Sequence, residues 1–446
     1  MSSALEALRR EFGGIIIEPG ATGYEAASRT VLAAGTPAYV LQPASVGDVQ
    51  AGVRFARDVG LPLSVRGGGH GFPGFGTNVD GVVIDLRRLA DVVVIDEERY
   101  VVRIGGGATW GQVAEALAPH GLAISSGDTR SVGVGGLTLT GGIGWKVRKH
   151  GLALDSVVAA EVVTAAGEVL HASAEENSEL FWAIRGGGGN FGIVTAFEFL
   201  AHPTTDVFFG TISFPAAEAA AVLAGWGQYF RSAPEELTSN VVFANPFLGG
   251  RDAPVQVLVA FDGDDPELAA EAIDPIRRLG TVLEDDVTLK PYGEILEEGL
   301  VPPPGILFLA RNGFVDEGSV PQVLQVLAEV GGSERSPIIA LRSVGGAVSR
   351  VPGDATAYAH RSAQLMFVTT FIGPQPAIDA AGPAMTQLWE KVGPHVTGAY
   401  ANFLTTATEE DVAAIYPGAT HRRLAAVKHR YDPDNLFAGN HNVRPR

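Results

Sequence analysis

Short apolar runs alternate with helical patterns from the start of the chain. Residues 39–43 and 61–65 form two such runs, and the spacing between them predicts a helix over residues 46–59. Ser45 is the expected N-cap of this helix and Gly60 its C-cap. This succession predicts a β-α-β unit. Ligands gather beyond the carboxyl ends of strands in such units, so a site is expected directly after the second run.

The rest of the first two hundred residues continues this pattern of short strands and helices. The alternation of apolar and polar positions over residues 193–200 is typical of a strand with one buried face. Residues 157–163 and 168–171 are expected to form a hairpin around residues 166–167. Further strands are expected at residues 82–86, 92–95 and 100–104, and helices at residues 2–12, 110–117 and 179–185.

The pattern changes after Pro203. Residues 204–396 mix strands with longer helices, which predicts a domain built on one antiparallel sheet with helices on one face. The other face of that sheet would carry no helices and could cover a site. The expected strands cover residues 208–214, 241–243, 255–261, 337–344 and 365–371, and the expected helices cover residues 216–230, 266–279, 320–329 and 377–392.

The last fifty residues return to the pattern of short elements seen in the first part of the chain. A helix is expected over residues 422–429, followed by a turn over residues 431–437. Aromatic and amide side chains, such as Tyr400, Asn440 and Asn442, stand close to the terminus. These residue types indicate that the tail is held on a domain or on a ligand.

Composition narrows the functional classes. The 446 residues carry a formal net charge of −18, which argues against nucleic acid or an anionic membrane as a partner. The chain has no cysteine, which excludes disulfides, thiolate metal sites and cysteine nucleophiles, and no metal site is indicated. No apolar run reaches the ~18–20 residues that span a bilayer, and the N-terminus does not read as a signal peptide. We expect a soluble, cytoplasmic protein.

The 57 glycines are concentrated in clusters. The first cluster is Arg66-Gly67-Gly68-Gly69-His70-Gly71, directly after the expected strand at residues 61–65. Glycine lets backbone approach a ligand closely, and consecutive N–H groups suit a diphosphate. A glycine-rich turn with a lone histidine is more often structural than catalytic, so this segment alone leaves both interpretations open. The segment is not a Walker loop, and it is not a clean dinucleotide-binding Gly-x-Gly-x-x-Gly turn, which makes a nicotinamide-dependent Rossmann enzyme the weakest alternative.

The second cluster, residues 127–144, holds more glycine than helix packing alone explains. With so few side chains, this backbone must lie against something flat or extended. Taken together, the motifs resemble the berberine-bridge-type branch of the vanillyl-alcohol-oxidase flavoproteins, and the nearest members are bacterial ones with a single flavin link. The motifs that carry the resemblance are residues 66–70, residues 127–144 with 149–155 after them, residues 180–192 and residues 431–437.

The resemblance covers about residues 35–204 and 397–446. It implies an α+β fold in which both chain ends form a PCMH-type FAD-binding domain, residues 1–203 with a core of about 35–203. Residues 397–446 return to that domain. A substrate domain, residues 204–396, is inserted between the two parts.

The resemblance also implies a cofactor, FAD. His70 is expected to be bonded covalently to the 8α methyl carbon of the flavin. Many relatives carry a second bond from a cysteine where this chain has Thr129, so a link through His70 only is expected. The other residues implied to bind FAD are Arg66, Gly67, Gly68, Gly69, Gly71, Gly127, Thr129, Val132, Gly133, Gly135, Gly136, Leu137, Gly141, Gly142, Gly144, Leu152, Asp155, Ile193, Val194, Tyr400, Asn402, Asn440 and Asn442.

The implied reaction is hydride transfer from a small organic substrate, an amine, alcohol, sugar or secondary metabolite, to FAD. A base would take a proton from an adjacent O–H or N–H group, unless the substrate is a neutral amine. Several relatives use a tyrosine as that base where this chain has Phe403, so its identity stays open. The candidate catalytic residues are Tyr292, Arg342, Tyr358, His360 and Asn402.

The electron acceptor is the last open point. Val132 matches a position where valine tends to admit dioxygen in the family, which favours an oxidase that releases hydrogen peroxide. Ordinary packing explains the valine about equally well, since valine is commonly buried. Two alternatives remain: an FAD-dependent dehydrogenase with a quinone or protein acceptor, and a non-catalytic flavin-binding protein.

Overall fold

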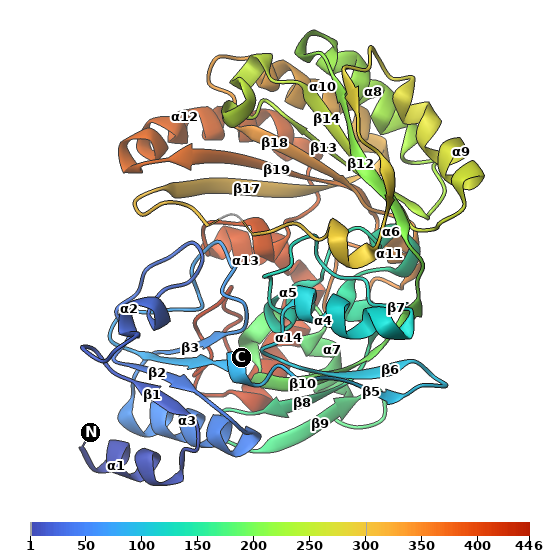
Figure 1. Ribbon diagram of the computed structural model, residues 1–446. Helices are drawn as coiled ribbons and strands as arrows, with labels where there is room; N and C mark the ends of the chain where they lie inside the picture. Colours follow the sequence, from blue (N-terminus) through green and yellow to red (C-terminus); the bar gives the residue numbers. More distant parts are fainter. Residues whose placement is uncertain (1, 300) are drawn as a thin grey trace.

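The computed structural model describes residues 2–299 and 301–446 and shows two lobes, one above the other in Figure 1. Both ends of the chain lie in the lower lobe, and the middle of the chain forms the upper lobe. Helices are combined with mainly antiparallel sheets, so the expected α+β class is confirmed. None of the helices in the described residues is long and apolar enough to cross a membrane.

The first sheet of the lower lobe contains the predicted β-α-β unit. Its elements are α1 (Ser2–Glu11), β1 (Ile15–Ile17), α2 (Tyr24–Ala27), β2 (Tyr39–Gln42), α3 (Val46–Val59), β3 (Leu63–Arg66) and β4 (Val82–Asp85), with strand order β1-β2-β4-β3. β2 and β3 both run parallel to β4, which lies between them. Ser45 Oγ accepts a bond from the backbone N–H of Asp48 at 3.2 Å, and Gly60 has a φ of +67°. Both predicted caps of α3 are therefore confirmed.

The second sheet of the lower lobe is antiparallel, with strand order β5-β6-β10-β8-β9. The predicted hairpin and the strand over residues 193–200 are confirmed. Helix α5 falls inside the second glycine cluster and was not predicted, because adjacent glycines lower helix propensity. The elements of this part are β5 (Val92–Asp96), β6 (Val101–Gly105), α4 (Trp110–Leu117), β7 (Leu122–Ala123), α5 (Val134–Thr140), α6 (Val147–His150), β8 (Val157–Val163), β9 (Val169–Ser173), α7 (Ser178–Ile184), β10 (Ile193–Leu200) and β11 (His202–Pro203).

The upper lobe is built on one antiparallel sheet with strand order β15-β12-β14-β13-β18-β19-β17, and β16 pairs with β12. Helices cover the upper face of this sheet, and its other face is turned toward the lower lobe (Figure 1). The elements are β12 (Val207–Phe214), α8 (Ala219–Tyr229), β13 (Leu237–Phe243), β14 (Val255–Phe261), α9 (Pro266–Arg277), β15 (Glu284–Asp285), β16 (Thr288–Lys290), β17 (Leu307–Asp316), α10 (Val320–Gly331), β18 (Ile338–Ser343), α11 (Ala347–Arg350), β19 (Ala363–Gly373) and α12 (Gln375–Val392).

β17 is the longest element that the apolar pattern did not predict. Arg311, Asn312 and Gly313 interrupt the pattern in the middle of this strand. Asn312 is nevertheless buried, because its side-chain amide bonds to the backbone of Tyr400 in the tail, with distances of 2.9 and 2.6 Å. The polar residue inside the strand therefore serves a contact with a distant part of the chain.

The tail, which contains α13 (Glu409–Ile415) and α14 (Gly418–Tyr431), is fixed on the lower lobe by a buried lysine. Nζ of Lys428 donates to the carbonyls of Asn190 and Phe437 at 2.8 and 3.0 Å, and to the Asp432 carboxylate at 2.6 Å. The backbone N–H of Val443 donates to the side-chain oxygen of Asn190 at 2.9 Å. The end of the chain is thus tied to the turn that precedes β10.

Candidate active site

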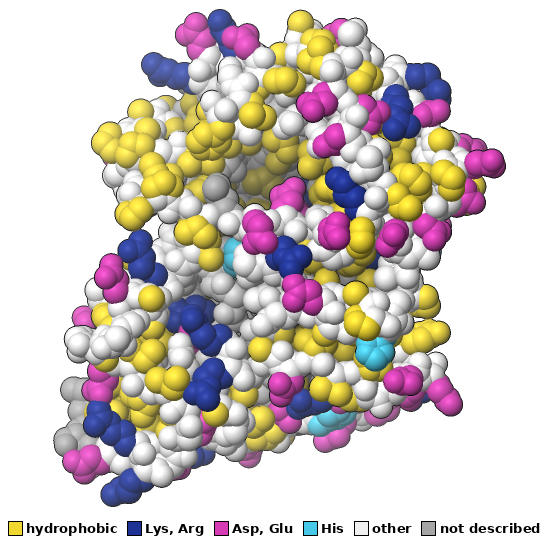
Figure 2. Space-filling model, viewed as in Figure 1, with side chains coloured by type: hydrophobic (Ala, Val, Ile, Leu, Met, Phe, Trp, Pro, Cys, Tyr) yellow, Lys and Arg dark blue, Asp and Glu magenta, His cyan; other side chains and the backbone are white. Residues whose placement is uncertain are grey.

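A cavity of about 340 Å³ is lined by segments from both ends of the chain. Figure 2 shows the molecule hollowed between the lobes, with acidic side chains along part of the rim. The loop after β3, the second glycine cluster, the turn before β10 and the tail all line the cavity. The predicted cofactor residues in the lining are Arg66, Gly67, Gly68, Gly69, His70, Gly71, Gly127, Thr129, Val132, Gly133, Gly135, Gly136, Leu137, Ile193, Val194, Tyr400, Asn402 and Asn440.

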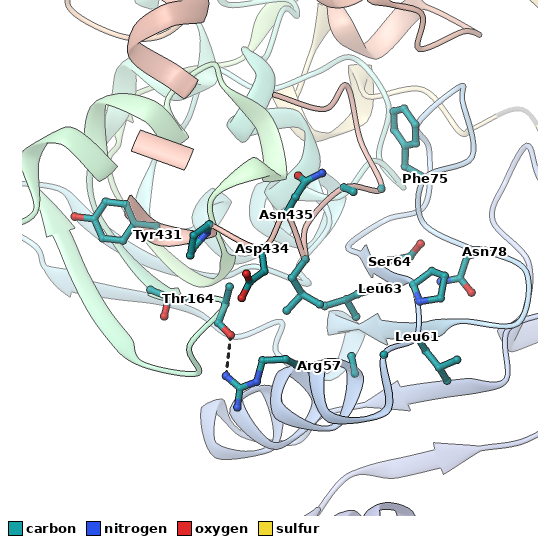
Figure 3. A pocket seen from close by; sticks show the side chains of 18 of the residues that line it. Arg57, Leu61, Leu63, Ser64, Phe75, Asn78, Thr164, Tyr431, Asp434 and Asn435 are labelled. Carbon is teal, nitrogen blue, oxygen red and sulfur yellow. Dashed lines mark hydrogen bonds between the residues drawn. The ribbon is translucent and has the colours of Figure 1, made fainter. Parts of the chain in front are cut away.

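A larger cavity, of about 870 Å³, is lined by residues of α3, β3 and the tail (Figure 3). Arg57 on α3 donates to the carbonyl of Ala165 at 3.3 Å in its wall. Leu63 and Phe75 line both cavities, so the two are neighbours. The predicted cofactor residues line the smaller cavity, and we therefore take that one as the candidate site.

The floor of the smaller cavity is glycine backbone. We call the main chain of residues 67–71 and 127–137, without its side chains, the glycine floor. A Cβ on Gly68 or on Gly133 would overlap the backbone of the other, so the two clusters touch through their main chains. A Cβ on Gly135 would lie 2.8 Å from the carbonyl oxygen of Gly106. Gly136 differs, because a Cβ there would meet no other described part of the chain within 4 Å. A flat group can therefore lie directly on the backbone of α5 at Gly136.

Arg66 lines the cavity, but its guanidinium is directed into the protein. It donates to the Asp85 carboxylate at 2.8 Å and to the carbonyls of Ala27 and Arg29 at 2.7 and 2.8 Å. Both side chains of the Arg66–Asp85 pair are buried. Arg66 therefore holds the start of the glycine loop against β4, and it leaves ligand contacts to the backbone that follows.

His70 stands near the end of the first glycine cluster, with most of its ring buried. Burial lowers the pKa of the imidazole, and a hydrogen bond with the backbone of Ser131 opposes that effect. The Nε2 atom is buried and has no hydrogen-bond partner in the part of the chain that the structure describes. The ring is therefore neutral at pH 7 with one nitrogen unused.

Tyr400 and Asn402 form a short hydrogen-bonded group at the edge of the floor. The phenol oxygen of Tyr400 accepts bonds from the Asn402 side-chain amide at 2.9 Å and from the backbone N–H of Gly142 at 3.0 Å. Burial raises the pKa of Tyr400, against the lowering effect of these two bonds. Tyr400 is thus a neutral phenol that links the tail to the second glycine cluster.

A charged group borders the cavity where the lobes meet. Nη1 of Arg342, on β18, lies 2.5 Å from the Asp128 carboxylate, which belongs to the cavity lining. Both side chains are mostly buried, 16% and 19% exposed. Glu297 adjoins them, because its backbone N–H donates to the Asp128 carbonyl at 2.8 Å. Burial raises the pKa of Glu297, the negative charge of Asp128 adds to this, and Arg342 opposes it.

Aromatic rings complete this side of the site. Phe72 follows the first glycine cluster, Phe308 lies on β17 and Phe403 lies in the tail. The ring centres of Phe72 and Phe308 are 5.9 Å apart, and those of Phe72 and Phe403 are 5.7 Å apart. The Arg342 guanidinium lies 5.3 Å from the Phe403 ring. We call Phe72, Asp128, Glu297, Phe308, Arg342 and Phe403 the side-chain wall; Phe72, Asp128 and Phe403 line the cavity, and the other three contact those residues.

The structure brings only part of the predicted catalytic set to the cavity. Asn402 lines it directly, and Arg342 reaches it through Asp128. Tyr292 does not line it, because its hydroxyl lies 3.0 Å from Ser126 Oγ in a fully buried cluster, with Lys146 Nζ 4.5 Å from its ring centre.

Tyr358 and His360 also lie outside the lining. Burial raises the pKa of Tyr358, and its hydroxyl has no partner among the described residues. The His360 ring stacks on Phe314 at 4.9 Å, and its Nε2 lies 3.0 Å from the carbonyl of Ile415. Burial lowers the pKa of His360 to about 4. Both side chains pack the upper lobe against the tail.

Some predicted cofactor residues stand behind the floor. Asp155 shows why: its carboxylate accepts two bonds from Arg361, each 2.8 Å long, and one from the Leu152 N–H at 2.9 Å. That carboxylate is fully used inside the protein. The predicted cofactor residues outside the lining are Gly141, Gly142, Gly144, Leu152, Asp155 and Asn442.

The sequence analysis missed most of the side-chain wall. Asp128 had a signal, since it is an acidic residue directly before Thr129 in a glycine-rich cluster. Glu297 and Phe308 had none, because they reach the site only through the folding of the upper lobe. Phe72 directly follows the first cluster, but nothing local showed that it faces other aromatic rings.

Comparisons with known proteins identify the family of this chain. Residues 37–173 match a family described as FAD binding domain, and residues 399–444 match one described as berberine and berberine like. The chain is 32% identical over 435 residues to (R)-6-hydroxynicotine oxidase from Paenarthrobacter nicotinovorans, over 92% of this chain and 91% of that protein.

Solved structures give the same result. Xylooligosaccharide oxidase from Myceliophthora thermophila, in complex with xylobiose, has a TM-score of 0.86 and 26% identity over 99% of each chain. A structure concerning the 6-S-cysteinyl, 8α-N1-histidyl FAD of glucooligosaccharide oxidase from Acremonium strictum has a TM-score of 0.84 and 26% identity, over 100% of this chain and 99% of that one. The resemblance expected from the glycine motifs is confirmed. The chain is therefore an enzyme of the berberine-bridge-like family of FAD-binding oxidoreductases.

Proposed function

We propose that this protein is an oxidase that holds FAD in the smaller cavity by one covalent bond, through His70, and passes electrons from a small organic substrate to dioxygen. His70 carries the proposal. It is a largely buried, neutral imidazole with an unused ring nitrogen, at the edge of a floor made of glycine backbone.

The residues in the cavity fit FAD. The space above Gly136 accepts a flat ring system, and the glycine backbone offers N–H groups of the kind that bind a diphosphate. Asn440 also lines the cavity, and its side-chain oxygen is buried without a partner in the described residues. FAD would be held by His70, the glycine floor, the Tyr400–Asn402 pair and Asn440.

The chain's composition supports a single link. The FAD named for glucooligosaccharide oxidase carries a cysteinyl and a histidyl bond. This chain has no cysteine, and Thr129 lines the cavity next to Asp128. A hydroxyl group is a poor substitute for a thiolate as a nucleophile, so the histidyl bond alone is proposed.

FAD, when bound, supplies a two-electron acceptor for hydride from a substrate C–H bond. The chain must orient the substrate and accept a proton. Asp128 is the acidic side chain in the lining, and Arg342 fixes its carboxylate. We assign Asp128 the role of accepting a proton from a substrate O–H or N–H group, since Phe403 has no group that can do so.

The side-chain wall also supports a substrate class. The relatives named above include a hydroxynicotine oxidase and a xylooligosaccharide oxidase. The aromatic rings of Phe72, Phe308 and Phe403 favour a substrate with a flat, apolar body, and the Asp128–Arg342 pair favours one polar group on it.

Val132 supports dioxygen as the acceptor, because this small side chain lines the cavity beside the glycine floor. The test has two steps. Mass spectrometry of the intact chain should show the added mass of one FAD. Anaerobic reduction by hydroxylated aromatic amines, followed by mixing with air, should then give rapid reoxidation and hydrogen peroxide. Reoxidation no faster than that of free flavin, with rapid reoxidation by a quinone, would instead identify a dehydrogenase.

A further inference from the structure

One segment of the upper lobe runs alongside the second glycine cluster. The backbone N–H of Glu297 donates to the Asp128 carbonyl at 2.8 Å, and the N–H of Arg130 donates to the Glu297 carbonyl at 2.9 Å. Thr129 and Glu297 form a parallel bridge. We call residues 292–299 the seam segment. It is joined to the lower lobe by main-chain bonds that do not depend on side-chain identity.

Side chains strengthen this junction at both ends. The hydroxyl of Tyr292 lies 3.0 Å from Ser126 Oγ, and Nη1 of Arg130 donates to the Gly293 carbonyl at 3.0 Å. Nε of Arg130 lies 3.5 Å from the Glu298 carboxylate. The seam segment is therefore held in a fixed register against the glycine floor, although it belongs to the other lobe.

The end of the seam segment touches His70. A Cβ on Gly299 would lie 2.9 Å from Cε1 of the His70 ring, 2.5 Å from Ser131 Oγ and 3.4 Å from Cγ2 of Thr129. The φ of Gly299 lies outside the left-handed region, so the backbone itself does not require glycine. What requires glycine at this position is the narrow space between Ser131, the imidazole of His70 and Thr129.

We propose that Gly299 is a positioning residue for flavin attachment: the upper lobe provides a fixed wall behind His70, and the missing side chain leaves the imidazole free to reach the 8α carbon. This inference rests on the proposed His70 link. Attachment replaces one C–H bond of the 8α methyl group and the imidazole N–H bond with a C–N bond. The two electrons and two protons released pass to the flavin ring and then to dioxygen, which becomes hydrogen peroxide.

The test compares Gly299→Ala with Gly293→Ala in the full chain. Gly293 is the matched control, because a Cβ there would only meet Ala114 at 3.8 Å. Each protein is denatured in acid, and the flavin that stays on the chain is measured by absorbance and intact mass. We expect wild type and Gly293→Ala to be linked equally. Gly299→Ala should carry at least fivefold less covalent flavin while still binding FAD reversibly. Equal linkage in Gly299→Ala would overturn the inference.

A double variant separates the two close contacts of the added methyl group. Ser131→Ala removes the contact with Ser131 Oγ and leaves the contact with His70 in place. Gly299→Ala with Ser131→Ala should therefore fold and still lose the link, even if Gly299→Ala alone does not fold. Restored linkage would show that His70 clearance is not the cause. Absence of covalent flavin from the wild type would contradict the proposed function itself.

Discussion

The glycine floor and the side-chain wall face the same cavity but are built by opposite means. The floor presents backbone, and its shape depends on side chains being absent, as at Gly68 and Gly133. The wall presents charges and rings that come from the glycine loop, the upper lobe and the tail. A backbone surface recognises a large group common to many proteins, whereas converging side chains recognise one substrate. From this contrast we propose that the floor binds the cofactor and that the wall determines selectivity.

The strongest test of the floor's role is the loss of its single proposed bond. His70→Ala should abolish covalent flavin completely, because no cysteine is present to form another link. FAD should still bind reversibly, since the glycine backbone is unchanged. The measurement is the yellow colour that remains on the acid-denatured chain. Retained colour would place the link elsewhere.

Substitutions at two neighbouring glycines on α5, Gly135 and Gly136, distinguish contact with the cofactor from packing within the protein. In the His70→Ala background, Gly136→Ala should weaken FAD binding at least tenfold, because the methyl group enters the cavity. It should leave the FAD-free protein as stable as before, or more stable by about 0.5–1 kcal/mol, since alanine favours helix.

Gly135→Ala should do the reverse. Its methyl group would press on the carbonyl of Gly106 and lower the free energy of unfolding by about 1–3 kcal/mol. Fluorescence titration with FAD and urea unfolding of the FAD-free proteins measure the two effects. If Gly136→Ala and its parent bound FAD equally well, Gly136 would not be a contact of the cofactor.

His360, which packs the upper lobe against the tail, tests how the stability of the fold depends on pH. Its pKa is about 4 in the folded protein, below the value of about 6.5 expected when unfolded, because burial disfavours the charged ring. Between these values the unfolded chain binds a proton that the folded protein does not bind. The free energy of unfolding should therefore fall as the pH drops from 7 to 4, by up to about 3 kcal/mol from this residue.

Urea unfolding at pH 7 and pH 4.5 measures that loss. His360→Gln keeps a donor for the Ile415 carbonyl and should show a smaller loss between the two pH values than wild type. His120→Gln, at an exposed position, is the control. The same loss in His360→Gln as in wild type would show that another group controls the pH dependence.

The smallest expected effect concerns the charges of the wall. Asp128→Asn leaves Arg342 without its anion and should lower the free energy of unfolding by about 1–2 kcal/mol. Glu298→Gln is the matched control, because the Glu298 side chain is largely exposed and its pair with Arg130 should contribute less than about 0.5 kcal/mol. Equal effects of the two substitutions would show that the Asp128–Arg342 pair stabilises the fold no more than the Arg130–Glu298 pair does.

The floor was predictable from the sequence because its determinants are local. Ser45 and Gly60 fix the ends of α3, and the glycine clusters mark where backbone must approach a ligand. The same locality explains why Asp155 was expected at the cofactor. It lies close to the second cluster along the chain, but its carboxylate is taken by Arg361, which is distant in sequence.

The wall was not predictable because tertiary contacts decide it. Tyr292 and His360 have side chains suited to proton transfer, but packing directs them into buried clusters away from the cavity. β17 was missed for a related reason. Asn312 interrupts its apolar pattern in order to hold Tyr400, and no periodicity along the strand can reveal a partner in the tail.

The tie between Lys428 and the turn before β10 has a consequence for how the enzyme is made. Arg66 and His441 line the same cavity, yet the ribosome synthesises the second long after the first. A nascent chain therefore lacks one side of the pocket until translation has passed His441. FAD can therefore make its full set of contacts only after that stretch has been synthesised, and we expect it to bind to a chain already released from the ribosome.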